Sequence, residues 1–261
     1  MTPSPVTRWI ILGLVGILFS VPIIAMINFS FSVPTGGYTV DHWTALFNPD
    51  NARTYRQLFQ SIGNSFLLAA VTVAIVLLIL LPAMVLVHLQ FPRLKRVLEF
   101  ICIIPITVPA IVLVVGLAPV YSVVVKVLGG NVWTLAFAYG ITVLPYAYRA
   151  IQANLDAVPV VTLSEAARTL GANWLTVLGR VLLPNLRRGV LAAAFISVAV
   201  VLGEFTIASL LNRRNLQTAL LQIGQSDPWV AVILALLSLA FAFVLLLLIG
   251  RLGSVGRKQT S

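Results

Sequence analysis

The feature that most constrains this chain is a series of long apolar runs that recur along its whole length. Hydrophobic residues make up 60% of the 261 residues and charged residues only 9%, and the mean hydropathy is +1.04. A soluble domain of this size has too little buried volume for so much apolar surface and needs more polar side chains facing water. The composition therefore predicts an integral membrane protein.

A bilayer core of about 30 Å needs about 20 mostly apolar residues in each crossing helix. Counting such runs predicts an all-α fold with six transmembrane helices in one domain, 1–261. The first run lacks the short core and the small-residue cleavage site of a signal peptide, so we expect a retained anchor. Prolines inside several spans predict kinked helices. The six spans are expected near 8–30, 63–89, 97–120, 132–154, 188–211 and 229–251.

The distribution of Lys and Arg predicts the orientation of these spans, because cytoplasmic loops carry an excess of positive charge. With the N-terminus inside, the cytoplasmic segments hold 12 basic residues, among them Arg257 and Lys258, and the opposite side holds five. Both termini are therefore expected in the cytoplasm. The longest inside loop is then 155–187, and the longest outside loops are 31–62 and 212–228.

Several chemistries are excluded by composition. One cysteine, Cys102, and two histidines, His42 and His88, build neither a disulfide framework nor a Cys/His zinc site. The basic residues form no continuous stripe for nucleic acid, despite a net charge of +10. No segment matches the phosphate-binding P-loop pattern, and no grouped nucleophile and base suggest an enzyme.

The loop 155–187 is longer than a simple helix connection requires. Thr162 followed by Glu165 fits a capping box that starts a short helix, and Gly171 offers a left-handed stop. A second short helix is expected over 174–182, ended by Pro184. From these residues alone, an amphipathic connector at the lipid headgroups is an equally good interpretation.

The same loop carries a spacing that resembles a known family. Glu165-Ala166-Ala167, then three residues, Gly171, nine residues and Val181-Leu182-Leu183-Pro184 is similar to the EAA loop of MetI-like (type I) ABC importer permeases. In that pattern Ile stands where this chain has Val181. The loop also occupies the expected place, between the fourth and fifth of six spans.

The resemblance implies that the loop is a coupling helix that docks on a separate ATP-binding subunit. Two such subunits, which bind ATP and Mg²⁺, would drive the permease between inward-open and outward-open states, and this chain would hold no cofactor of its own. The resemblance further implies a second permease, either a homologue or a second copy, an extracytoplasmic binding protein, and a bacterial inner membrane in contact with lipid. The implied docking residues are Glu165, Ala166, Ala167, Gly171, Leu183 and Pro184.

Glu204 is the one carboxylate expected well inside a span, where a charge needs a partner or a water-filled path. The alternative is a glutamate that hydrogen-bonds a neighbouring helix. No Lys or Arg is expected at a similar depth, which favours a cationic substrate. Tyr139 and Tyr146 in the fourth span are candidate cation–π partners, although packing is the commoner role of such residues.

Within the family, the segments GYTVDHWTALF, SIGNSFLLAA and FTIASLL resemble spermidine/putrescine-type permeases. The resemblance implies polyamine transport, with ferric iron, sulfate, molybdate, thiamine and aminoethylphosphonate as alternative substrates. An ion-coupled secondary transporter would need several ionisable residues inside the membrane and repeated halves, whereas this sequence has one deep acid and no convincing repeat. A membrane scaffold that transports nothing would leave the loop spacing and Glu204 unexplained.

Overall fold

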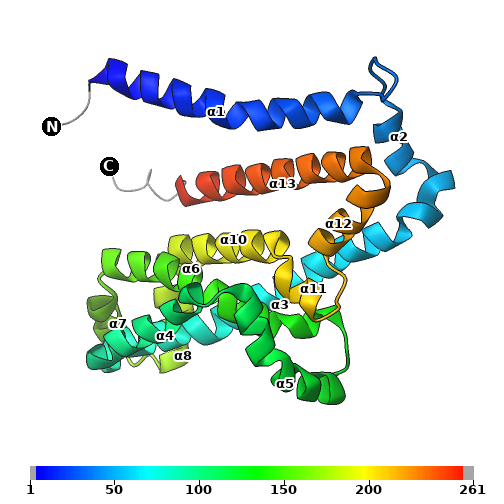
Figure 1. The fold of residues 1–261 in the computed structure, drawn as a ribbon. Helices are drawn as coiled ribbons and strands as arrows, with labels where there is room; N and C mark the ends of the chain where they lie inside the picture. Colours follow the sequence, from blue (N-terminus) through cyan, green and yellow to red (C-terminus); the bar gives the residue numbers. More distant parts are fainter. Residues whose placement is uncertain (1–3, 255–261) are drawn as a thin grey trace. The chain divides into compact units, whose positions relative to one another are not determined.

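The structure is a computed structural model that describes residues 4–254, leaving undescribed the side chains at 5, 52, 54, 246 and 248–254. Nearly all of this range is helical (Figure 1), and its one β contact is the isolated bridge between Ser32 and Tyr38. The chain divides into two compact units, which we describe separately. Unit 1 comprises 1–59 and 219–243, and unit 2 comprises 60–218 and 244–261.

Unit 1 is held together by aromatic contacts. The Trp229 ring stacks on Phe29, with 5.8 Å between ring centroids, and on His42, with 4.9 Å. The Tyr55 hydroxyl donates to Asp227 Oδ2 at 3.3 Å. The helices of this unit are α1 (Pro5–Phe31), α2 (Asp41–Phe47), η1 (Pro49–Asn51), the start of α3 (Ala52–Gln90), and parts of α12 (Leu216–Ser226) and α13 (Pro228–Ser254).

Unit 2 contains most of α3 and all the helices between α3 and α12. Its core includes the fully buried rings of Tyr139 and Tyr148. Its further elements are η2 (Pro92–Leu94), α4 (Lys95–Thr107), α5 (Ala110–Leu128), η3 (Val132–Leu135), α6 (Ala136–Ala157), α7 (Val160–Thr169), α8 (Trp174–Thr176), the π-helix η4 (Val177–Leu182), α9 (Leu183–Asn185), α10 (Arg187–Gly203) and α11 (Thr206–Leu210).

The helices α6 and α10 lie side by side and form the main packing pair of unit 2 (Figure 1). Gly189, Ala193, Ser197 and Val201 are all buried at four-residue spacing along α10. The three small residues of this stripe, Gly189, Ala193 and Ser197, let two membrane helices approach closely. A Cβ at Gly189 would lie 2.6 Å from Asn154 Cβ and 3.1 Å from the Ala150 carbonyl oxygen, so this contact requires glycine.

The helices differ from the predicted spans in several places. Among the described residues, four helices are long and apolar enough to cross a membrane, Val6–Phe31, Tyr55–Gln90, Ala110–Leu128 and Pro228–Leu245, and a bent pair raises the number to five. The fourth predicted span, now α6, is not among them, because Arg149 and three tyrosines lower its hydropathy. Six spans are therefore not confirmed.

Two predicted spans are broken rather than continuous. The third span, 97–120, divides between α4 and α5 at Val108 and Pro109, since proline has no N–H to donate and forces Val108 into an extended conformation. The fifth span, 188–211, divides between α10 and α11, where Glu204 is extended with φ −85° and ψ 126°. Our expectation of Glu204 inside a helix was wrong.

The predicted loops also contain regular structure. The segment 31–62 includes α2, η1 and the first turns of α3, and 212–228 includes α12. Lys95, at the start of α4, and Asp156, near the end of α6, form an ion pair with 3.0 Å between Nζ and Oδ1. Two connections that we expect in the cytoplasm therefore meet. Arg257 and Lys258, which contribute to the predicted orientation, lie outside the described residues.

Candidate functional site

The loop 155–187 begins with α7, whose two faces differ. Val160 and Ser164 are buried against the rest of unit 2, whereas Glu165 and Ala166 are exposed and Ala167 is half-buried. The helix starts at Val160, after Pro159, two residues before the predicted cap Thr162. Proline fixes φ ahead of the first turn and starts the helix earlier, so the predicted capping box was wrong.

The turn after α7 is made by Gly171, as predicted. Its φ is +84°, in the left-handed region that favours glycine. The Gly171 N–H donates to the Arg168 carbonyl at 2.9 Å, and the Ala172 N–H donates to the Ala167 carbonyl at 3.0 Å. These two bonds form a Schellman motif, which satisfies the last carbonyls of α7 and reverses the chain.

The second half of the loop begins at Asn173, whose side chain accepts from the Thr176 N–H at 2.9 Å. The helix then continues past Pro184 to Asn185 through α8, η4 and α9, so Pro184 does not end it as predicted. A bend of 78° separates this stretch from α10. Leu182 and Leu186 are buried, while Leu183 and Pro184 face outward.

Two leucines in this loop are exposed to an extent unusual for their type. Leu170 is 88% exposed and Leu175 is 77% exposed, on either side of the Gly171 turn. Neither leucine is among the predicted site residues, although an apolar residue on each side of a predicted turn in a polar loop is a readable signal. Together with Glu165 and Ala166, they give the loop an outward surface of two leucines, one alanine and one carboxylate, which we call the loop surface.

The break between α10 and α11 is organised by Glu204. Its two carboxylate oxygens accept from the Ile207 N–H at 3.0 and 3.1 Å, which caps the first turn of α11. The carboxylate is half-buried and also interacts with the hydroxyl of Tyr139, which is fully buried. The structure thus brings together two of the three residues predicted for the substrate path.

A third residue of this group, Asn215, was not predicted. Its Nδ2 donates to the Glu204 backbone oxygen at 2.8 Å and to the Tyr139 hydroxyl at 3.1 Å. Its Oδ1 accepts from the Thr218 N–H, while Thr218 Oγ1 accepts from the Asn215 N–H, both at 2.9 Å. This reciprocal pair is a capping box at the start of α12, and its sequence signal was the spacing Asn-x-x-Thr.

The same segment is anchored to two further helices. The Leu216 N–H donates to Ser65 Oγ of α3 at 2.7 Å, and Gln217 Nε2 donates to the Leu202 carbonyl of α10 at 2.8 Å. Asn64 Nδ2 donates to the carbonyl of Arg214 at 3.1 Å. We call 203–218 the junction, because it links α3, α6 and α10.

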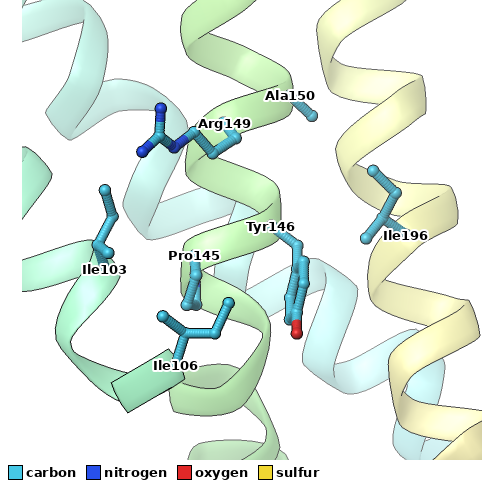
Figure 2. A pocket seen from close by; sticks show the side chains of 7 residues that line it. All are labelled: Ile103, Ile106, Pro145, Tyr146, Arg149, Ala150 and Ile196. Carbon is cyan, nitrogen blue, oxygen red and sulfur yellow. The ribbon is translucent and has the colours of Figure 1, made fainter.

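Tyr146, the third predicted path residue, lies apart from the junction. It lines a cavity of about 540 Å³ with Arg149 and Ala150 on the same helix (Figure 2). Ile103 and Ile106 of α4 lie to one side of these residues and Ile196 of α10 lies to the other. The Tyr146 ring is 40% exposed, so it belongs to an open surface of unit 2.

The start of the loop carries an ion pair that ties it to α4. Asp156 accepts from Gln152 Nε2 at 2.8 Å and from Lys95 Nζ at 3.0 Å. These contacts, first the bond from Gln152 and then the Lys95 ammonium, lower the pKa of the Asp156 carboxyl. At neutral pH the carboxylate is therefore ionised and fixes the end of α6.

The chain is similar to a known protein family and to a curated protein. The family described as binding-protein-dependent transport system inner membrane component matches residues 85–254, which include the loop, the junction and the cavity. A curated relative, the probable ABC transporter permease protein y4fN of Sinorhizobium fredii, is 28% identical over 276 residues. The match covers 99% of this chain and 48% of the relative, so the chain spans about half the length of that protein.

Proposed function

The chain belongs to the family of binding-protein-dependent transport system inner membrane components, and from that membership we propose that it is the membrane-spanning permease subunit of an ABC importer. In this family the ATPase activity lies in a partner subunit. The chain would contribute the translocation path and would receive the energy of ATP hydrolysis through a contact with that partner. We place the complex in a bacterial inner membrane, with both termini of this chain in the cytoplasm.

The loop surface is the structural observation that supports a contact with the ATP-binding subunit. Exposed leucines cost free energy in water, so a pair at 88% and 77% exposure supports a surface that a partner covers. Ala166 allows a close approach, and Glu165 provides a charge for a basic residue on the partner. The Schellman turn at Gly171 and the buried Leu182 fix this surface on unit 2. A displacement of the loop by the partner would therefore also move α6 and α10.

The partners follow from the same assignment. Two ATP-binding subunits would bind ATP and Mg²⁺, and an extracytoplasmic binding protein would deliver the substrate. A second permease would complete the path, either a homologue or a second copy of this chain. The curated relative is about twice as long as this chain, so that relative has room for a second domain of the same size.

For the substrate, we propose a cation of the polyamine class, with Glu204 and Tyr139 on its path. A carboxylate has about four acceptor positions, and the Ile207 N–H occupies only part of this capacity. A half-buried carboxylate with remaining acceptor positions beside a phenol suits an ammonium group. Ferric iron, sulfate or molybdate, thiamine and aminoethylphosphonate are the rival substrates.

The test is ATPase stimulation in lipid nanodiscs that contain this chain, its ATP-binding subunit and its permease partner. The binding protein is added after loading with spermidine, putrescine, ferric iron, sulfate, molybdate, thiamine or aminoethylphosphonate. Stimulation by a polyamine alone supports both parts of the proposal. Stimulation by an oxyanion keeps the importer and overturns the substrate, whereas a chain that binds no ATP-binding subunit contradicts the importer.

A further inference from the structure

The cavity beside Tyr146 has a volume of about 540 Å³, within the range of about 300 to 1,000 Å³ found for small-ligand pockets. Its walls come from α4, α6 and α10, all in unit 2 (Figure 2). Five of its seven lining residues are Ile, Pro or Ala, and the other two are Tyr146 and Arg149. It is therefore an apolar groove that contains one cation.

The cation and the apolar residues lie at different depths along the helices. Arg149 precedes Asp156 by seven residues on α6, so it lies about 10 Å along the helix axis from the Lys95–Asp156 ion pair. Ile103 follows Lys95 by eight residues on α4, and Ile196 follows Arg188 by eight on α10, which places both about 12 Å from those charges. The isoleucines and Tyr146 are thus deeper than Arg149, measured from the end that carries the loop.

The Arg149 charge is poorly neutralised within the chain. Its closest carboxylate oxygen, Glu99 Oε1, is 3.9 Å from Nη2, and the two side chains are 68% and 40% exposed. Asp156, about two turns further along α6, is already bonded to Lys95 and Gln152. The Tyr146 hydroxyl has no hydrogen-bond partner among the described residues. A cation and a donor therefore remain available beside the groove.

We propose that this groove is a binding site for one anionic phospholipid of the cytoplasmic leaflet. The lipid phosphate pairs with the Arg149 guanidinium, and its acyl chains lie against Ile103, Ile106 and Ile196. The Tyr146 hydroxyl, about one turn deeper than Arg149, is available to the ester oxygens. The inference rests on the proposed function in one respect, because it takes the end that carries the loop as the cytoplasmic side.

The chemistry of the groove favours a lipid over a water-soluble ligand. A basic residue beside an apolar cleft at the cytoplasmic end of membrane helices matches an anionic headgroup followed by acyl chains. A soluble anion would gain the contact with Arg149 but would leave the isoleucines and Pro145 exposed to water. A long arginine side chain can lay its apolar stem along such a groove while its guanidinium reaches toward the headgroups, which satisfies both parts of the side chain.

The test is native mass spectrometry of the purified full-length chain with phosphatidylglycerol and phosphatidylcholine that carry identical acyl chains. We expect phosphatidylglycerol to bind in preference. Arg149→Gln removes one charge-assisted hydrogen-bonding group, so this variant should bind phosphatidylglycerol about tenfold more weakly. The matched control is Arg180→Gln, which removes an exposed arginine outside the groove and should bind like the parent chain. Equal binding of the two lipids, or unchanged binding by Arg149→Gln, overturns the proposal.

Phosphatidylglycerol with a photoactivatable acyl chain locates the site in the same preparation. Cross-links at Ile103, Ile106 or Ile196 support the proposal, whereas cross-links confined to other helices overturn it. If glycerol phosphate reduces this cross-linking as strongly as unlabelled phosphatidylglycerol does, the site binds the free anion. If the cross-link joins two chains at this groove, a second copy is its occupant. Either result also overturns the proposal.

Co-purification of Arg149→Gln with the ATP-binding subunit is scored separately, so failure of the lipid site is distinguished from failure of the importer assignment.

Discussion

The 155–187 loop and the 203–218 junction both interrupt helices of unit 2, and they do so by opposite means. The loop ends α7 with backbone hydrogen bonds at Gly171 and leaves Leu170 and Leu175 outside. The junction ends α10 with side-chain hydrogen bonds from Asn215 and is tied to three helices. Under the proposed function, the loop leaves its apolar side chains available to a partner, whereas the junction uses its polar groups to fix its own shape. We therefore expect changes in the loop to affect assembly and changes in the junction to affect stability.

The largest loss of stability is expected from Asn215→Ala. The substitution removes the cap of α12 and leaves the Glu204 carbonyl and the Tyr139 hydroxyl without this donor, at a cost of about 3 kcal/mol. Thermal unfolding of the isolated chain in detergent measures it. The control is Asn185→Ala, an exposed asparagine with one bond to the Val181 carbonyl, which should cost much less. Equal melting temperatures for the two variants would show that the junction is not a structural anchor.

Gly171→Val is expected to cost about 1 to 2 kcal/mol, because a β-branched residue is strained at positive φ. No atom lies within 4 Å of a Cβ placed there, so the effect comes from the backbone alone. The reversal of the chain should be disturbed, and co-purification with the ATP-binding subunit should fall by more than the stability loss explains. Gly179→Ala, which also has open space around it, is the matched control. Normal assembly of Gly171→Val would separate the turn from docking.

These two positions also show how far the sequence predicts the structure. The Gly171 stop follows from local chemistry, as does the predominantly helical fold from the apolar runs. The break at Glu204 does not, because it depends on Asn215, Tyr139 and Ser65, which are far apart in the sequence. Hydropathy alone suggested a continuous span there, since the residues around Glu204 are apolar.

A smaller effect on stability, about 1 kcal/mol or less, is expected for Glu204→Gln, because the amide oxygen still accepts from the Ile207 N–H. Its effect on transport should be larger, since the amide attracts an ammonium group much less than a carboxylate does. Uptake of radiolabelled polyamine into proteoliposomes, set beside thermal unfolding, separates the two roles. Unchanged uptake would leave Glu204 with its capping role only.

Asp156→Asn should destabilise the chain by roughly 0.5 kcal/mol at pH 7, since an ion pair this exposed is weakened by solvent. The folded state lowers the pKa of this carboxyl, so its contribution is present above the ordinary carboxyl pKa of 3.8. The contribution is lost as the pH falls through the lower pKa of the folded state. Melting temperatures of the parent and the variant should therefore converge in acid. A difference that persists in acid would contradict the assigned cause.

The smallest change in stability, within about 0.5 kcal/mol, is expected for Leu175→Ser, because the side chain is 77% exposed. Binding of the ATP-binding subunit should nevertheless weaken, since an apolar contact of the loop surface is lost. Pull-down of that subunit measures the effect. Leu221→Ser, at a leucine 53% exposed on α12 outside the loop, is the control. Equal pull-down by both variants would remove Leu175 from the docking surface.

The most direct test of the coupling role is ATP hydrolysis by the complete importer with Glu165→Lys in this chain. Glu165 is exposed and has no ion pair among the described residues, so reversing its charge should leave the melting temperature of the isolated chain unchanged. We predict that stimulation of ATPase activity by the loaded binding protein is lost in this variant. Full stimulation, with the ATP-binding subunit bound as in the parent complex, would contradict the assignment of this loop as the coupling element.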